Sequence, residues 1–222
     1  MNSIMNSTST STTTRRIRRF IPFATIVAAA ALMVAPASGS AAIFGSELTP
    51  ETQPSNAGDG HACAPVPGTC TWAMNEAYGR PDGGERSPLT GKLKKVRLIA
   101  QVPGSFQLQI VSVKPDNSAK VVRQGPTISY QGQPAGNLDT YTIETFPVKV
   151  AIKKGQRLAI KTSNNSLVRC SSGGDNSLLY TPPLAPGAGY RATDADDGCW
   201  LLLEGVVKKG KKKKKGKKKK KK

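Results

Sequence analysis

The clearest pattern in the chain is an alternation of apolar and polar residues over residues 140–160. Tyr141 and Ile143 alternate with polar residues, and from position 148 to 152 apolar residues alternate with alanine or lysine. A period of two is typical of a strand with one buried face. Gly155 follows in a Lys-Lys-Gly-Gln turn, where a residue free to adopt positive φ is needed, and the alternation resumes at Leu158. The segment predicts a pair of strands joined by a tight reversal.

Shorter segments with the same pattern recur along the chain, and turn signals separate them about every 8 to 12 residues, as in β-sandwich domains. Residues 200–203 are apolar without alternation, which favours a central strand buried on both faces. We therefore predict an all-β fold, a single antiparallel β-sandwich. The further strands are expected at residues 69–73, 93–102, 106–110, 120–123, 127–130, 157–162, 167–170, 178–180 and 199–207.

The N-terminal region has the form of a signal peptide. The sequence RRIRRF precedes an apolar run at residues 20–34, whose length of about 15 residues is short of the roughly 20 that a membrane span needs. Two small-x-small motifs end at Ala37 and Ala42. We predict a signal peptide at residues 1–42, cleaved between 37 and 42, export by the general secretory route, and no retained membrane helix.

Composition divides the remainder into three parts. Residues 43–87 are rich in Pro and Gly and predict an ordered arm held by a disulfide, residues 88–207 carry the strand pattern of the β-sandwich, and residues 208–222 form a lysine tail. Because like charges repel and the tail has nothing apolar to bury, we expect it to be disordered.

The four cysteines predict two disulfides in an exported protein. Cys63 lies seven residues before Cys70, and Cys170 and Cys199 bracket a segment rich in Pro, Gly and Asp. Pairing neighbours is the favoured one of three connectivities. A zinc site is the weaker alternative, because His61 is the single histidine and no Cys-x-x-Cys pair is present.

The charge of +19 is concentrated at the two ends of the chain. Four arginines in residues 15–19 and thirteen lysines after position 207 leave 16 basic and 14 acidic residues between positions 43 and 207. The basicity is therefore interpreted as a property of the tail. We predict that the tail binds anionic envelope polymers or lipid headgroups, and nucleic acid only non-specifically, through Lys208, Lys209, Lys211, Lys212, Lys213, Lys214, Lys215, Lys217, Lys218, Lys219, Lys220, Lys221 and Lys222. A tail that only solubilises the protein is the alternative.

Several short motifs recur at turns and core positions of the strand pattern. They are Cys70-Thr71, Ser87-Pro88-Leu89-Thr90-Gly91-Lys92-Leu93, Phe106-x-Leu108-x-Ile110, Phe146-Pro147-Val148-Lys149-Val150 and Lys154-Gly155-Gln156-Arg157-Leu158. These motifs resemble those of uncharacterised secreted actinobacterial proteins with a jelly-roll-like β-sandwich domain. The resemblance covers residues 63–207 and implies a fold and a location but no function. At Gln156 this chain departs from the Asp that is usual in those proteins.

Two further groups of residues are candidates for ligand binding. Tyr180 and Tyr190 flank the loop TPPLAPGAG and could offer flat faces to a glycan, with packing in the core as the alternative. Asp194, Asp196 and Asp197 could supply oxygen ligands to Ca²⁺, with a solvated turn as the alternative. We expect no other cofactor.

Catalytic signatures are missing from the sequence. It contains no Gly-x-Ser-x-Gly elbow and no Walker-type glycine loop, although two carboxylates such as Glu76 and Glu85 could converge after folding. We predict a secreted non-enzymatic protein held at the cell envelope by its tail and serving surface recognition or structure. The alternatives are a carbohydrate-binding, lectin-like module, an extracellular polyanion or DNA binder, and a secreted hydrolase.

Overall fold

The protein is described from a computed structural model. The structure describes residues 41–54, 63, 68–133, 140–163, 166–171 and 173–210. All of them belong to the second of the two compact units of the chain, Met1–Ala37 and Ser38–Lys222. The predicted signal peptide therefore lies outside the described residues except at positions 41 and 42, and the predicted tail lies outside them from position 211 onward.

The described residues form twelve strands and no helix, which confirms the all-β prediction. None of them makes a helix with the length and hydropathy of a membrane span. The strands are β1 (Ala41–Gly45), β2 (Cys70–Met74), β3 (Gly91–Leu98), β4 (Gly104–Val113), β5 (Ala119–Tyr130), β6 (Glu144–Ile152), β7 (Arg157–Thr162), β8 (Val168–Cys170), β9 (Ser177–Tyr180), β10 (Ala195–Asp197), β11 (Cys199–Leu201) and β12 (Leu203–Lys209).

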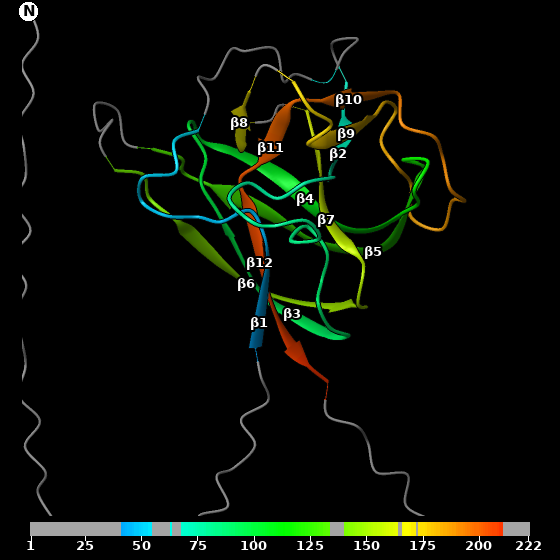
Figure 1. The fold of residues 1–222 in the computed structure, drawn as a ribbon, viewed down its shortest axis with the longest axis horizontal. Helices are drawn as coiled ribbons and strands as arrows, with labels where there is room; N and C mark the ends of the chain where they lie inside the picture. The colour runs from blue at the N-terminus through cyan, green and yellow to red at the C-terminus, as the bar shows by residue number, and fades with distance from the viewer. Residues whose placement is uncertain are drawn as a thin grey trace, which may run out of the picture. The chain divides into compact units, whose positions relative to one another are not determined.

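Ten of these strands form two antiparallel sheets (Figure 1). The four-stranded sheet has the order β1-β12-β3-β6, and the six-stranded sheet has the order β10-β9-β2-β7-β4-β5. The strands β8 and β11 pair separately with each other. Because β1 pairs with β12, the first and last strands of the described chain lie side by side.

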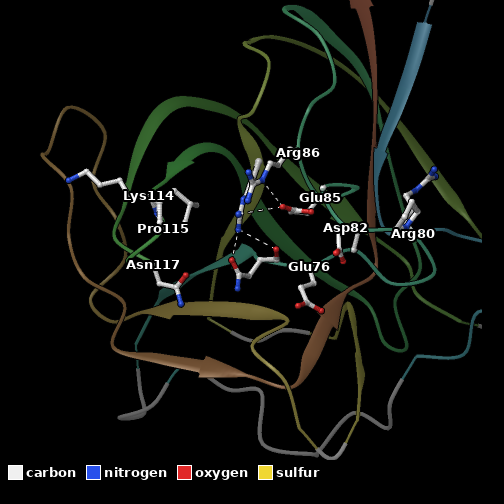
Figure 2. Close-up of a pocket in the computed structure, with 14 residues that line it drawn as sticks. Glu76, Arg80, Asp82, Glu85, Arg86, Lys114, Pro115 and Asn117 are labelled. Atoms are coloured by element: carbon white, nitrogen blue, oxygen red, sulfur yellow. Dashed lines mark hydrogen bonds and ion pairs between the residues drawn. The ribbon is translucent and has the colours of Figure 1, made fainter.

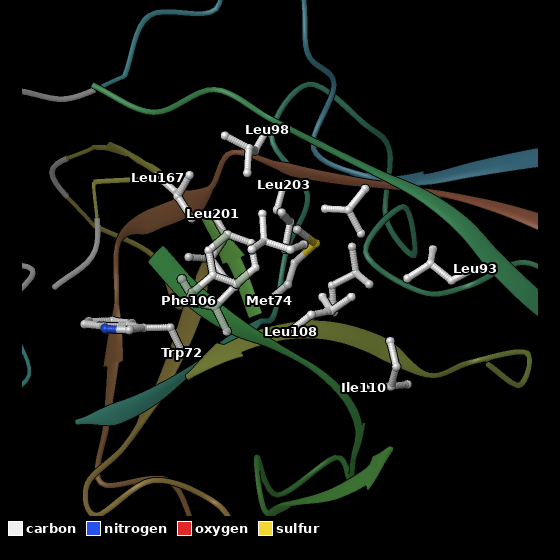
Figure 3. Close-up of a cluster of buried hydrophobic side chains, with 14 of the residues drawn as sticks. Trp72, Met74, Leu93, Leu98, Phe106, Leu108, Ile110, Leu167, Leu201 and Leu203 are labelled. Atoms are coloured by element: carbon white, nitrogen blue, oxygen red, sulfur yellow. The ribbon is translucent and has the colours of Figure 1, made fainter. Parts of the chain in front are cut away.

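The two sheets share one hydrophobic core. Leu93 and Leu98 from β3 pack in the same cluster as Leu108 and Ile110 from β4, and all four side chains are fully buried (Figure 3). Leucine and isoleucine at alternate positions of a strand direct their side chains to one face, so each sheet presents an apolar face to the other. Burial of this shared face stabilises the sandwich-like arrangement.

The turn around Gly155 joins the two sheets. Gly155 has a φ of 83°, which confirms the predicted reversal through a residue with positive φ. The predicted pairing of the flanking strands is wrong, because β6 belongs to the four-stranded sheet and β7 to the six-stranded one. The turn at Pro103 and Gly104 likewise connects strands of different sheets, β3 and β4. Alternation reports which face of a strand is buried but not which strand lies beside it.

A hairpin does join β4 to β5, through a turn over residues 114–117. Asn117 adopts a φ of 60° there, and Asp116 accepts hydrogen bonds from the backbone N–H and the hydroxyl of Ser118. Asn tolerates the left-handed region better than other non-glycine residues, which suits it to this position. The two short strands predicted at 120–123 and 127–130 are parts of one strand, β5.

The described residues of the segment 43–87, which was predicted to be an arm ahead of the sandwich, contribute strands to both sheets. They supply β1 to the edge of the four-stranded sheet, and β2 lies between β9 and β7 in the six-stranded sheet. All five side chains of β2 are buried. The strand predicted at residues 69–73 corresponds to β2, whereas β1 was not predicted, because five residues are too few for a strong periodic signal.

The apolar run at residues 200–203 is divided between two strands. Leu201 ends β11 and Leu203 begins β12, and both lie in the main core, whereas Leu202 packs in a separate cluster with Ile99. Apolar side chains are thus buried on both sides of the run, as predicted. Only Leu203 of the run belongs to a central strand, because β12 lies between β1 and β3 whereas Trp200 and Leu201 belong to β11, which pairs with β8.

Candidate functional site

A polar cavity of about 400 Å³ is lined by charged side chains of both signs. The loop at residues 75–86 forms one wall, and the β4–β5 turn forms the other through Lys114 and Asn117 (Figure 2). Glu76, Asp82 and Glu85 reach the cavity from the loop. The first residue of β7, Arg157, also lines it.

Arg157 holds this wall of the cavity in place. Its guanidinium donates hydrogen bonds to the carbonyl oxygens of Met74 (3.4 Å) and Asn75 (3.2 Å) and to the side-chain oxygen of Asn75. Burial lowers the pKa of Arg157, and the nearby carboxylate of Glu85 offsets part of this effect. Because arginine remains charged in proteins, the buried cation needs these acceptors.

Glu85 is the counter-ion of two arginines. Its Oε1 lies 3.4 Å from Arg157 and accepts a hydrogen bond of 2.7 Å from Nε of Arg86. The glutamate and Arg157 are both almost fully buried, at 5% and 6% exposure, whereas Arg86 is exposed. Glu85 therefore offsets one of these two positive charges, and its carboxylate is committed to structural ion pairs.

The cavity combines both signs of charge and contains no aromatic ring among its lining residues. Glu76 and Asp82 form no ion pair within the described residues. The arrangement can offer hydrogen bonds to a small polar molecule. It brings Glu76 and Glu85 to one cavity, as the hydrolase alternative requires, but two arginines engage Glu85.

Sequence reasoning missed Arg157 as a site residue. The available signal was a charged residue at the start of the segment Arg157–Thr162, which is otherwise apolar at alternate positions and almost completely buried. A buried cation needs a partner, and that partner comes from residue 85, far along the chain.

The proposed glycan platform is wrong for Tyr180. Its side chain is fully buried, packs in a second core cluster with Leu178 and Leu184, and donates a hydrogen bond of 2.8 Å to the carbonyl oxygen of Asn117. Burial raises the pKa of Tyr180. A ring without exposed faces cannot stack on a sugar, so this tyrosine has the alternative role, packing in the core.

Tyr190 is exposed, at 38%, but cations already lie over its ring. The Nζ atoms of Lys114 and Lys120 lie 4.3 Å and 4.6 Å from the ring centroid, and its hydroxyl is 3.0 Å from that of Ser112. The contacts fit cation–π interactions that hold the loop against the β4–β5 hairpin. Tyr180 and Tyr190 therefore do not form a joint surface.

The acidic loop does not gather its carboxylates. Asp194 accepts hydrogen bonds from the backbone N–H of Thr181 (2.7 Å) and from Arg191 (2.8 Å), and Asp197 accepts one from the N–H of Cys199 (3.0 Å). Asp196 and Asp197 are consecutive residues of β10, where neighbouring side chains point to opposite faces. Across the part of the chain that the structure describes, no three acidic, histidine or cysteine side chains are grouped to hold a metal ion.

Both disulfides have the pairing that sequence proximity favoured. Cys63 is bonded to Cys70 at the start of β2, and Cys170 is bonded to Cys199. The second bond joins directly opposed residues of β8 and β11. Disulfides form and persist in oxidising compartments, so they fit an extracellular location.

Of the thirteen tail lysines, Lys208 and Lys209 are described, and both are exposed. They are the last residues of β12, so the sheet extends two residues into the segment predicted to be tail. Lys208 pairs with Ala41 on one side and with Lys92 on the other. The other eleven lysines lie outside the described residues.

Comparisons with known proteins do not narrow the function. No protein-family model matches the chain, and neither a curated protein nor a solved structure is significantly similar to it. The function is therefore argued from the residues of this chain.

Proposed function

We propose that this is a secreted, non-enzymatic jelly-roll protein that its polycationic C-terminal tail retains at the cell envelope. The observation that carries the proposal is the run of thirteen lysines in the last fifteen residues. Such a run offers point charges without an apolar or aromatic surface, so anionic polymers or lipid headgroups are its natural partners.

The strand order supports the jelly-roll assignment. When β1 to β7 and β12 are numbered one to eight, the larger sheets contain the orders 1-8-3-6 and 2-7-4-5. This is the order expected when a long hairpin folds over into two sheets. β9 and β10 extend one sheet, and β8 and β11 form a small pair within the connection from β7 to β12.

Export is supported by the two disulfides and by the leader-like N-terminal sequence. At about 1 kcal/mol per lysine close to an anionic surface, half of the tail lysines would contribute roughly 6 kcal/mol, which is enough for reversible retention. The domain would then serve surface recognition or structure. The lectin-like alternative has lost Tyr180, which is buried, and in the hydrolase alternative Glu85 is engaged by two arginines.

The tail is tested by comparing the full chain with one that ends at Gly210, which keeps every described strand. Cells secreting each protein are separated into envelope and medium. We expect the full chain in the envelope fraction, released by salt, and the shortened chain mainly in the medium, because charge-driven binding weakens steeply as salt increases. Equal release of both proteins would contradict the tether.

A further inference from the structure

The outer face of the four-stranded sheet carries a group of lysines that we call the lysine face. It comprises Lys92, Lys94, Lys95, Lys149 and Lys208. Strand pairing brings these residues together from three parts of the chain, because Lys208 on β12 is directly opposite Lys92 on β3, and Lys149 lies on the next strand, β6. None of the five is buried.

Alternation with core residues directs these lysines outward. On β3, Leu93 and Val96 are fully buried, and on β6 the exposed Lys149 lies between buried Val148 and Val150. Two successive lysines, at positions 94 and 95, would normally point to opposite faces. The pairing register shifts between Leu93 and Lys95, so that Lys94 is an extra residue relative to β12. Such a bulge lets both lysines face the solvent.

No acidic side chain among the described residues pairs with the lysines of this face. The carboxylate on its central strand, Glu204, is buried and already bound by Arg97 at 2.6 Å and Arg80 at 2.9 Å. Within the described residues, no lysine of the face forms an ion pair with a carboxylate. Like charges directly opposite each other in a sheet are destabilising. The repulsion between Lys92 and Lys208 thus reduces stability, and no carboxylate of the described residues pairs with either lysine to offset it.

The face is also hollowed. A depression of about 470 Å³ is lined by Lys94, Lys95 and Arg97 of β3, by Thr145 of β6, and by Val206 and Lys208 of β12. It contains no carboxylate, and its cations could contact an anionic chain from two sides.

A narrow polymer fits this surface better than a bilayer does. Among the described residues of this face, Ile43, opposite Val206, is the single large apolar side chain that is exposed. Binding to a membrane surface relies on a broader apolar face. Lys208 lines the depression and is also the first residue of the lysine run at 208–222, so the depression shares a cation with that run.

We propose that the lysine face is a binding surface for a linear, phosphate-bearing polyanion. The choice of an envelope polyanion as the partner rests on the proposed function. The inference adds that the folded domain contributes part of the affinity. The partner is recognised by its repeated negative charge, since lysines bind phosphate groups as point charges without reading a base or a headgroup.

The test uses the chain ending at Gly210 and long-chain inorganic polyphosphate. The face variant replaces Lys92, Lys94, Lys95 and Lys149 by glutamine. The control variant removes the same charge on or beside the six-stranded sheet, through Lys114→Gln, Lys120→Gln, Arg123→Gln and Lys161→Gln. Affinity is measured by titration between 50 and 200 mM salt.

We expect the parent chain to bind, and the face variant to bind on the order of 100-fold more weakly at the lowest salt. The slope of log affinity against log salt should fall by about three, close to the 0.7 per neutralised charge found on single strands. The control variant should change affinity by less than about threefold, since long-range charge effects are screened. The face variant should melt no lower than the parent, because cross-strand repulsion is relieved.

Three results would overturn the inference. The first is an absence of binding by the parent chain at 50 mM salt. The second is a loss of affinity in the control variant equal to that in the face variant. The third is binding to vesicles of anionic phospholipid that is as tight as binding to polyphosphate and depends on the same lysines. The tail proposal fails separately. If the full chain is released from cells as freely as the chain ending at Gly210 while the latter binds polyphosphate, the face stands and the tether does not.

Discussion

Tyr180 and Arg157 show how burial decides the role of a single side chain. Both are polar residues inside the protein, and each has a hydrogen-bond partner supplied by another part of the chain. Burying either group without a partner would cost about 1–3 kcal/mol or more, so these contacts constrain the loops that provide them. The tyrosine thus anchors the β4–β5 turn at Asn117.

Stability should depend on the buried tyrosines at alkaline pH. Burial raises the pKa of both Tyr180 and Tyr130, so their contribution is complete below their unfolded pKa of about 10 and is lost as the pH rises above it. We expect the free energy of unfolding in urea to fall between about pH 9 and pH 11.5. Tyr180→Phe should cost about 1 kcal/mol at pH 7 by removing a hydrogen bond, and its stability should decline less steeply.

The informative quantity is the difference in the free energy of unfolding between the unmodified protein and the Tyr180→Phe variant at each pH. The difference should shrink or reverse as the pH rises, because the variant has one fewer phenol that must stay neutral in the folded state. Parallel curves for the two proteins would show that Tyr180 does not titrate differently in the folded and unfolded states.

At the scale of elements, the turn between β6 and β7 connects two sheets and depends on Gly155. The glycine has a φ of 83° and open space around its Cα, so the cost of a side chain there is conformational rather than steric. We expect Gly155→Ala to lower the free energy of unfolding by about 1 kcal/mol. Gly189, which also has open space but no positive φ, is the matched position.

Gly189→Ala should leave stability unchanged or raise it slightly, because alanine restricts the unfolded chain. Chemical denaturation of both variants provides the comparison. Equal effects at the two positions would mean that the conformation at Gly155 is not required by the crossing between the sheets.

The same crossing shows which part of the fold was predictable. The alternation located β6 and β7 and the glycine between them, because these are properties of neighbouring residues. It did not show that the strands separate into different sheets, because pairing partners are chosen by packing over long distances in sequence. The same is true of residues 93–110. Their alternation located β3 and β4 but did not show that these consecutive strands belong to different sheets.

At the scale of the whole molecule, the disulfides limit how far the unfolded chain can expand. The bond between Cys170 and Cys199 closes a segment of 29 residues, and the bond between Cys63 and Cys70 closes one of seven. Loop-closure entropy predicts stabilisation of about 3.6 and 2.5 kcal/mol, respectively. Replacing both cysteines of the longer loop by serine should therefore destabilise the protein more than the same change in the shorter loop.

Urea unfolding of the two double-serine variants at neutral pH measures this order. Adding a reductant to the unmodified protein should lower its stability below that of either variant, because it opens both loops. The reverse order between the variants would show that strain or packing, rather than loop closure, controls their contribution.

The distribution of charge is also a property of the whole molecule. The 16 basic and 14 acidic residues between positions 43 and 207 nearly balance, and from the sequence alone this balance indicates no partner. Folding separates them. The basic residues at 92, 94, 95 and 149 join Lys208 on one sheet, while Asp194, Asp196 and Asp197 lie in or beside the edge strand of the other sheet.

The sequence by itself determined the features that depend on local pattern. Alternation defined an all-β chain, neighbouring cysteines indicated their own partners, and the lysine run defined a tail whose binding remains a prediction. Only the tertiary structure decided what depends on distant segments meeting: the two sheets, the burial of Tyr180, the ion pair of Arg157 with Glu85, and the lysine face. The physical reason is that strand pairing and burial are cooperative over the whole chain, whereas periodicity and composition are local.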